Sequence, residues 1–185
     1  MATAIVRNGV NLDQLVSTIE SIKADPHLAQ FKFRSRSRWD SCGRCVTEIR
    51  SFYGAGVEQE HTQVHTLVGD EPAVLLGTDS GPNAVETVLA ALASCLAVGY
   101  AYNAAARGID IEELTFSLEG DLDLHAFLGL SGERRPGFEN IQVNYRVKST
   151  ASDDDLSELE EHVLRTSPVL DILRNPVLVT IKRAS

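Results

Sequence analysis

Apolar positions repeat with two different periods along the first part of the chain. Residues 12–24 follow Asn11 with apolar side chains spaced three and four apart, which predicts a short amphipathic helix behind an N-cap. Residues 31–39 alternate at every second position, with phenylalanine, serine and tryptophan on one face and basic side chains on the other. Period two predicts a half-buried strand.

Glycine-containing segments mark the turns that follow. A break at 40–44 precedes a second alternating run at 45–53, so these two strands are expected to form a hairpin. Residues 54–56 interrupt the pattern, 62–68 predict a third strand, and 70–82 have the composition of a loop.

The longest apolar run predicts a helix of about 24 residues over 84–107, between Pro82-Asn83 and Gly108. It is apolar on nearly every face, so we expect protein to surround it. Its most apolar stretch, 88–102, is shorter than the roughly 20 residues that a bilayer requires. The start of the chain also has no signal-peptide pattern, so a soluble, cytoplasmic protein is expected.

The remaining patterns complete an α+β domain built around this single helix. Two alternating segments, 111–124 and 139–147, predict strands, and Ser152 starts a second helix. Pro168 ends that helix, a further turn is expected next, and 176–182 are expected to form the last strand.

Composition and charge narrow the range of functions. The 185 residues are 43% hydrophobic and 23% charged, close to an average globular domain. A net charge of −9 argues against binding to nucleic acid or to a membrane surface. Arg34, Arg36 and Arg38 are expected to be solvated or to pair with acidic residues of a dimer partner. Three cysteines, an odd number, fit a reducing cytosol.

Cys95, within the apolar helix, has two readings. It is a small core side chain, or it is a nucleophile whose thiolate some neighbour stabilises. Glu86, near the start of the same helix, either supplies an ordinary N-terminal charge or orients an arginine that lowers the pKa of Cys95.

The sequence resembles the OsmC/Ohr superfamily of osmotically inducible and organic-hydroperoxide-resistance proteins. GPNAVETVLAALASC resembles the central-helix signature of that family, and DEPAVLLGTDSGPN resembles its entry loop. TFSLEGDLDL and ENIQVNYRV are similar to the two strands that follow, and SELEEHVLRTSPVLDILRNPVLVTI to the second helix and closing strand. The resemblance covers about residues 31–183. We therefore expect an N-terminal helical extension at 1–30 and one OsmC-like domain at 31–185.

The resemblance implies an intertwined homodimer, with long central helices wrapped by antiparallel sheets, that reduces organic hydroperoxides with a thiol. Cys95 matches the peroxidatic cysteine of the family. Arg44 and Glu86 are candidates for its arginine and glutamate, which stabilise the thiolate and hold the arginine. The resolving cysteine of the family opens a Cys-Pro pair, whereas this chain has Ser167-Pro168. Regeneration would then need an external small-molecule or protein thiol, or another cysteine of this chain.

Cys42 and Cys45 form the motif CGRC at the predicted hairpin turn. A thioredoxin-like role fits poorly, because such motifs open a helix. The spacing of Cys42, Cys45, His61 and His65 permits a zinc site, although the histidine segment alternates like a strand. Either thiol could replace the missing resolving cysteine, or both could lack a role.

The resemblance thus implies a hydroperoxide reductase. No cofactor is expected, since the sequence carries no GxGxxG after a strand, no Walker A motif and no HExxH. The alternative is an OsmC-fold stress or small-molecule-binding protein without peroxidase turnover, in which Cys95 is a core residue.

Overall fold

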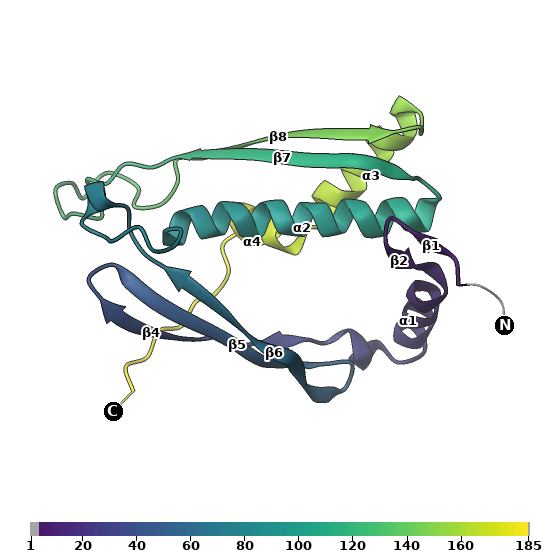
Figure 1. The fold of residues 1–185 in the computed structure, drawn as a ribbon, viewed down its shortest axis with the longest axis horizontal. Coiled ribbons are helices and arrows are strands. Elements are labelled where there is room, and N and C mark those ends of the chain that lie inside the picture. Colours follow the sequence, from purple (N-terminus) through teal and green to yellow (C-terminus); the bar gives the residue numbers. More distant parts are fainter. Residues whose placement is uncertain (1–3, 185) are drawn as a thin grey trace. The chain divides into compact units, whose positions relative to one another are not determined.

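The structure is a computed structural model that describes residues 4–184. Packing divides this part of the chain into two compact units, one formed by residues 4–5 and 11–88 and the other by 6–10 and 89–184. The boundary falls within helix α2 (Ala84–Arg107) (Figure 1). Helices and antiparallel sheets are both present, which confirms the predicted α+β class.

The first unit contains one α-helix, two short 3-10 helices and an antiparallel sheet. Its elements are α1 (Leu12–Ala24), η1 (Pro26–Ala29), β3 (Lys32–Phe33), β4 (Arg36–Ser41), β5 (Arg44–Gly54), β6 (Val57–Gly69) and η2 (Ala73–Leu75). The predicted first helix is confirmed, and the Asn11 side chain caps it by accepting a hydrogen bond from Gln14 N–H at 3.0 Å. No residue of α1 is fully buried within the described chain, and its apolar stripe is half-buried at Leu12, Leu15 and Ile22 and exposed at Val16 and Ile19.

Strand β5 is the centre of the sheet. It pairs with β6 along one edge and with β3 and β4 along successive parts of the other. The predicted hairpin of β4 and β5 is confirmed, with Cys42-Gly43 at its turn, and β5 and β6 form a second hairpin around Ala55-Gly56. Ala55 and Gly56 have φ of 51° and 83°, which is the backbone that a tight two-residue hairpin requires.

The prediction of one regular strand over 31–39 is wrong. Phe33 lies opposite Phe52, whereas Arg36 lies opposite Glu48, so three steps along β3–β4 match four steps along β5. Glu48 and Phe52 are four residues apart on β5 and point to the same face. Phe33 therefore lies on the same face of the sheet as Arg36, and Trp39 lies on the opposite face. The cause is the break between β3 and β4, where the pairing with β5 shifts by one residue.

One buried carboxylate organises the loop at 70–82. Asp70 is 2% exposed and accepts hydrogen bonds from the backbone N–H groups of Glu71, Thr78 and Ser80 and from the hydroxyls of Thr78 and Ser80, at 2.6–3.1 Å. These donors hold the pKa of Asp70 well below its usual range, the Thr78 hydroxyl contributing most. A Cβ on Gly77 would lie 1.7 Å from the Glu71 carbonyl oxygen, so the loop closes only with glycine there.

A short N-terminal hairpin was not anticipated from the sequence. Strands β1 (Val6–Arg7) and β2 (Val10–Asn11) flank Asn8-Gly9, whose φ values are 49° and 78°. The Asn8 side chain donates to Ile109 O and accepts from Ile111 N–H, both at 2.9 Å. Asn-Gly is a common two-residue hairpin turn, so the sequence did contain the signal.

The second unit packs one face of α2 against a two-stranded sheet and two helices. Its other elements are β7 (Ile111–Asp121), β8 (Asn140–Ser149), α3 (Asp153–Thr166) and α4 (Pro168–Arg174), all close to their predicted positions. Figure 1 shows β7 and β8 running along α2. The core cluster consists of Leu92, Leu96, Tyr100, Ala104, Ile109, Leu159, Val163 and Leu170.

We expected protein to surround all of α2. Within the described chain, protein covers only one face of this helix. Its buried residues follow one stripe, and Val98 and Tyr102 on other faces are 53% and 52% exposed. The full helix, unlike its most apolar stretch, is long and apolar enough to cross a bilayer, a test that core helices of soluble proteins also pass.

The predicted last strand is not formed within the described chain. Residues 176–184 have neither helix nor strand, and Leu178 and Ile181 are 96% and 90% exposed. A strand exists only through hydrogen bonds to a neighbouring strand, so an apolar alternating segment without such a neighbour stays extended and exposed.

Candidate functional site

Cys95 lies on the side of α2 that packs against the end of α3. Leu92 and Leu96, three residues before and one after it, are almost fully buried, and Cys95 itself is half-buried. Its Sγ lies 3.2 Å from the Oγ of Ser167. The structure thus brings together two of the residues that the sequence singled out, from positions 72 apart in the chain.

Ser167 is held at the junction of two helices. It is the C-cap of α3, where its N–H donates to Val163 O at 3.0 Å, and the N-cap of α4, where its carbonyl accepts from Asp171 N–H at 3.0 Å. Its side-chain oxygen also accepts from Leu170 N–H at 3.4 Å. At 5% exposure, Ser167 is one of two buried polar residues in the described chain. Its hydroxyl therefore faces the sulfur with little competition from water.

A glycine allows the two helices to approach this closely. A Cβ on Gly99 would lie 3.0 Å from Val163 Cγ1. Gly99 is one turn after Cys95 on α2, and Val163 is one turn before Ser167 on α3. The Gly99–Val163 contact thus lies one helical turn away from the Cys95–Ser167 contact, between the same two helices. It determines how closely α2 and α3 approach, and therefore the distance between the Cys95 sulfur and the Ser167 hydroxyl.

Arg44 begins β5, and its guanidinium forms an ion pair with Asp40 across the hairpin turn. Asp40 also accepts from Arg38 at 3.2 Å. The side chain of Arg44 is 31% exposed. Sequence reasoning overlooked Asp40, although an acid on the strand facing Arg44 across a tight turn is the signal that could have identified it.

Glu86 belongs to the N-terminal capping box of α2. Its carboxylate accepts from Asn83 N–H at 2.8 Å, and the Asn83 side chain accepts from Glu86 N–H at 2.9 Å. In this structure, Arg44 and Glu86 thus bond to different residues. Both lie in the first unit, whereas Cys95 lies in the second.

The two CGRC thiols have different surroundings. Cys42 is exposed at the hairpin turn with φ of 48°, and its Sγ donates to Leu76 O at 2.8 Å. Cys45 lies on β5 opposite Trp39 on one side and Gly69 on the other. All three cysteines of the chain are free thiols.

The zinc arrangement that the spacing permits is not assembled. His61 and His65 come together where β6 bulges away from β5, with ring centroids 4.9 Å apart. Within residues 4–184, no group of three or more His, Cys, Asp or Glu side chains is arranged to hold a metal ion.

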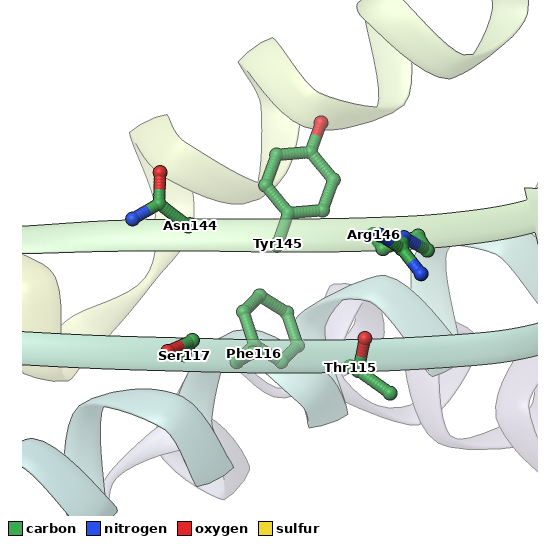
Figure 2. Close-up of a pocket in the computed structure, with 6 residues that line it drawn as sticks. All are labelled: Thr115, Phe116, Ser117, Asn144, Tyr145 and Arg146. Atoms are coloured by element: carbon green, nitrogen blue, oxygen red, sulfur yellow. The ribbon is translucent and has the colours of Figure 1, made fainter.

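Within the described chain, a surface depression lies on each of two sheets. The larger, of about 340 Å³, is on β7 and β8, where the rings of Phe116 and Tyr145 lie side by side (Figure 2). The neighbouring residues of the two strands complete its lining: Thr115, Ser117, Asn144 and Arg146. The smaller is lined by Arg36, Arg38, Val46 and Glu48. Neither depression is lined by Cys95.

Comparisons with known proteins found similarity to one protein family and to solved structures of the same fold. A model of the OsmC-like protein family matches residues 77–182, more than half of the chain. No curated protein matches it.

Among the solved structures that match this chain, three illustrate the shared fold at low sequence identity. An OsmC-like protein from Mycoplasma pneumoniae is 16% identical, with TM-score 0.60 over 78% of this chain and 89% of that one. An OsmC-like protein of unknown function from Vibrio cholerae is 12% identical, with TM-score 0.56 over 76% and 92%. The organic hydroperoxide resistance protein OsmC from Legionella pneumophila is 13% identical, with TM-score 0.50 over 77% and 90%.

Proposed function

This chain belongs to the OsmC-like protein family, and we propose that it is a thiol-dependent reductase of organic hydroperoxides with Cys95 as the attacking residue. The observation that carries the proposal is the 3.2 Å approach of a buried hydroxyl to Cys95 Sγ, because a hydrogen bond to sulfur favours the thiolate. The hydroperoxide resistance protein with the same fold supports the substrate class.

The first half of the cycle is a two-electron oxidation of sulfur. The Cys95 thiolate attacks the distal oxygen of the hydroperoxide, forming an S–O bond while the O–O bond breaks. The leaving alkoxide takes a proton and departs as the alcohol, and Cys95 is left as a sulfenic acid. Arg44 is proposed to stabilise the thiolate and the leaving oxygen, and Glu86 to orient Arg44 once it leaves Asp40.

The second half returns Cys95 to the thiol. One external thiol attacks the sulfenic acid, releases water and forms a mixed disulfide with Cys95. A second thiol then attacks the sulfur of the first, which frees Cys95 as a thiol and leaves the two external thiols joined in a disulfide. Small-molecule or protein thiols fit this scheme. Cys42 or Cys45 is the proposed internal substitute for the first of these thiols.

The functional assembly is proposed to be a cytoplasmic homodimer, with 31–185 as one OsmC-like domain behind the extension at 1–30. Two exposed apolar surfaces support a second copy: the uncovered face of α2 and the segment 176–184. Neither surface would remain exposed in a stable soluble monomer without cost.

The second candidate function is that of an OsmC-fold stress or small-molecule-binding protein without peroxidase turnover. Ser167 favours it, because a hydroxyl cannot form a disulfide with Cys95. In that case Cys95 serves as a core side chain beside a hydrogen-bonding serine.

Peptide mapping separates the two functions. The protein is treated with one equivalent of cumene hydroperoxide while dimedone traps sulfenic acid, and Cys95→Ala is the control. Rapid consumption of peroxide with an adduct at Cys95, or a disulfide from Cys95 to Cys42 or Cys45, is the expected result. Unconsumed peroxide with reduced Cys95 would reject the reductase and leave the binding protein.

A further inference from the structure

We propose that Ser167 is the positioning residue of this site: its hydroxyl donates to the Cys95 thiolate and keeps the sulfur reactive. Cys95 Sγ and Ser167 Oγ are 3.2 Å apart, and either atom can be the donor while sulfur is protonated. Once the proton leaves sulfur, only the hydroxyl has a hydrogen to give. The contact therefore stabilises the ionised form specifically.

The other contacts of Ser167 leave its hydroxyl hydrogen free for this task. The Oγ lone pairs serve the backbone, since Leu170 N–H donates to them at 3.4 Å. Within the described chain, Cys95 Sγ is the one acceptor recorded for the hydroxyl hydrogen of Ser167. Ser167 is also 5% exposed, so water competes poorly for that hydrogen.

The geometry is fixed from both sides of the contact. The Ser167 backbone is bonded to Val163 O and to Asp171 N–H, each at 3.0 Å, so the residue cannot shift without disturbing both helix ends. On the other side, the Gly99–Val163 contact fixes how closely α2 approaches α3. A hydroxyl held in this way stabilises charge without having to reorganise first.

This inference rests on the proposed function for its chemical consequence. After oxygen transfer, Ser167 can hydrogen-bond to the new sulfenic oxygen but has no thiol with which to displace it. The oxidised sulfur must therefore persist until a thiol from elsewhere reaches it, which makes the Cys95 sulfenic acid a trappable species.

The test measures the alkylation rate of Cys95 against pH, resolved by peptide mapping of the full chain. Ser167→Ala is expected to lower the alkylation rate of Cys95 at neutral pH about tenfold, and Ser167→Thr to restore it. Ser152→Ala is the matched control, because it removes the N-cap of α3 without touching Cys95 and should leave the profile unchanged. An unchanged Cys95 profile in folded Ser167→Ala would overturn the inference.

Ser167→Cys provides a second readout that does not depend on helix capping. Because its new sulfur would start near Cys95, peroxide treatment is expected to give a Cys95 disulfide and to abolish the dimedone adduct. If the adduct persists undiminished, the two side chains are not in contact in solution and the inference fails.

The two proposals fail in different ways. If Ser167→Ala lowers the alkylation rate of Cys95 while the unmodified protein leaves cumene hydroperoxide unconsumed, the positioning role stands and the reductase is rejected. If peroxide is consumed through Cys95 while Ser167→Ala keeps the original profile, the reductase stands and the positioning role is rejected.

Discussion

At the scale of single residues, Asp70 is a buried anion satisfied entirely by neutral donors. Five hydrogen bonds from three residues converge on its carboxylate, which replaces the hydration that burial removes. No cation is recorded beside it within the described chain, so the loop at 70–82 depends on hydrogen bonding rather than on an ion pair.

We expect Asp70→Asn to lower the melting temperature. The Oδ2 atom accepts four of the five bonds, and an amide NH2 in that place would face four donors. The control is Asp79→Asn, an acid of the same loop with no side-chain bond recorded in the described chain. Equal melting temperatures for both variants would contradict this account.

The pH dependence of the same residue follows from its lowered pKa. Its contribution to stability is fully present above the ordinary aspartate pKa of about 3.9 and is lost as pH falls toward the folded value. Below pH 4, the free energy of unfolding should therefore fall less steeply with decreasing pH in Asp70→Asn than in the unmodified protein. Urea unfolding at a series of pH values measures this.

Tyr100 presents the opposite case, a buried polar atom that lacks a well-formed hydrogen bond. Within residues 4–184 its hydroxyl makes no hydrogen bond of ordinary geometry, although Tyr145 lies close enough to affect its pKa, and the ring packs against Phe116 and Tyr145 with centroids 6.0 and 5.3 Å away. Burial raises the pKa of Tyr100, so ionising it above pH 10 works against folding.

Tyr100→Phe should therefore be neutral, or stabilising by about 1 kcal/mol, since it removes an unsatisfied group and keeps the ring. Urea unfolding at pH 7 measures this, with Tyr145→Phe for comparison. A loss of more than about 1 kcal/mol would show that the hydroxyl has a partner in solution.

At the scale of elements, the sequence predicted the helices well because their signals are local. Asn11, Ser152, Pro168 and Gly108 act through the backbone groups nearest to them, and the helices begin or end where these residues stand. The break in the strand after Phe33 could not be predicted from local sequence signals of this kind. Both sides of it alternate correctly, and only the pairing with β5 reveals the shift in register.

The candidate site was only partly predictable for the same reason. The resemblance identified Cys95 and Ser167, but their contact depends on how α2 and α3 pack, which no local pattern specifies. Asp40 and Asn83 were overlooked as partners of Arg44 and Glu86, although the sequence held both signals: an acid facing Arg44 across a tight turn, and an Asn three residues before a Glu at a helix start.

The helix pair makes its own prediction. Gly99→Leu should destabilise the protein by about 1–3 kcal/mol, because leucine favours helix but its side chain would collide with Val163. Urea unfolding measures the effect. Ala106→Leu, at an exposed position of the same helix, is the control. Adding Val163→Ala to Gly99→Leu should recover part of the loss, and no recovery would place the collision elsewhere.

At the scale of the whole molecule, the proposed homodimer explains why so much apolar surface is exposed in one chain. Val98 and Tyr102 on α2, and Leu178 and Ile181 near the C-terminus, are each more than half exposed. Large exposed apolar surfaces of this kind mark contacts with other chains.

We expect Val98→Glu to weaken the dimer, because the dimer would bury an unpaired carboxylate. Sedimentation equilibrium should show a dimer for the unmodified protein and a shift toward monomer for the variant. Val57→Glu, an exposed β6 position, is the control. A monomeric unmodified protein would contradict the proposal outright.

The double capping role of Ser167 has an evolutionary consequence. A residue there must end one helix, begin the next and present a small polar atom to Cys95. Serine and cysteine codons can differ by a single nucleotide, and the two side chains differ by one atom. Regeneration through an internal disulfide and dependence on an outside thiol are thus neighbouring states in sequence space. A lineage can pass between them without rebuilding the fold.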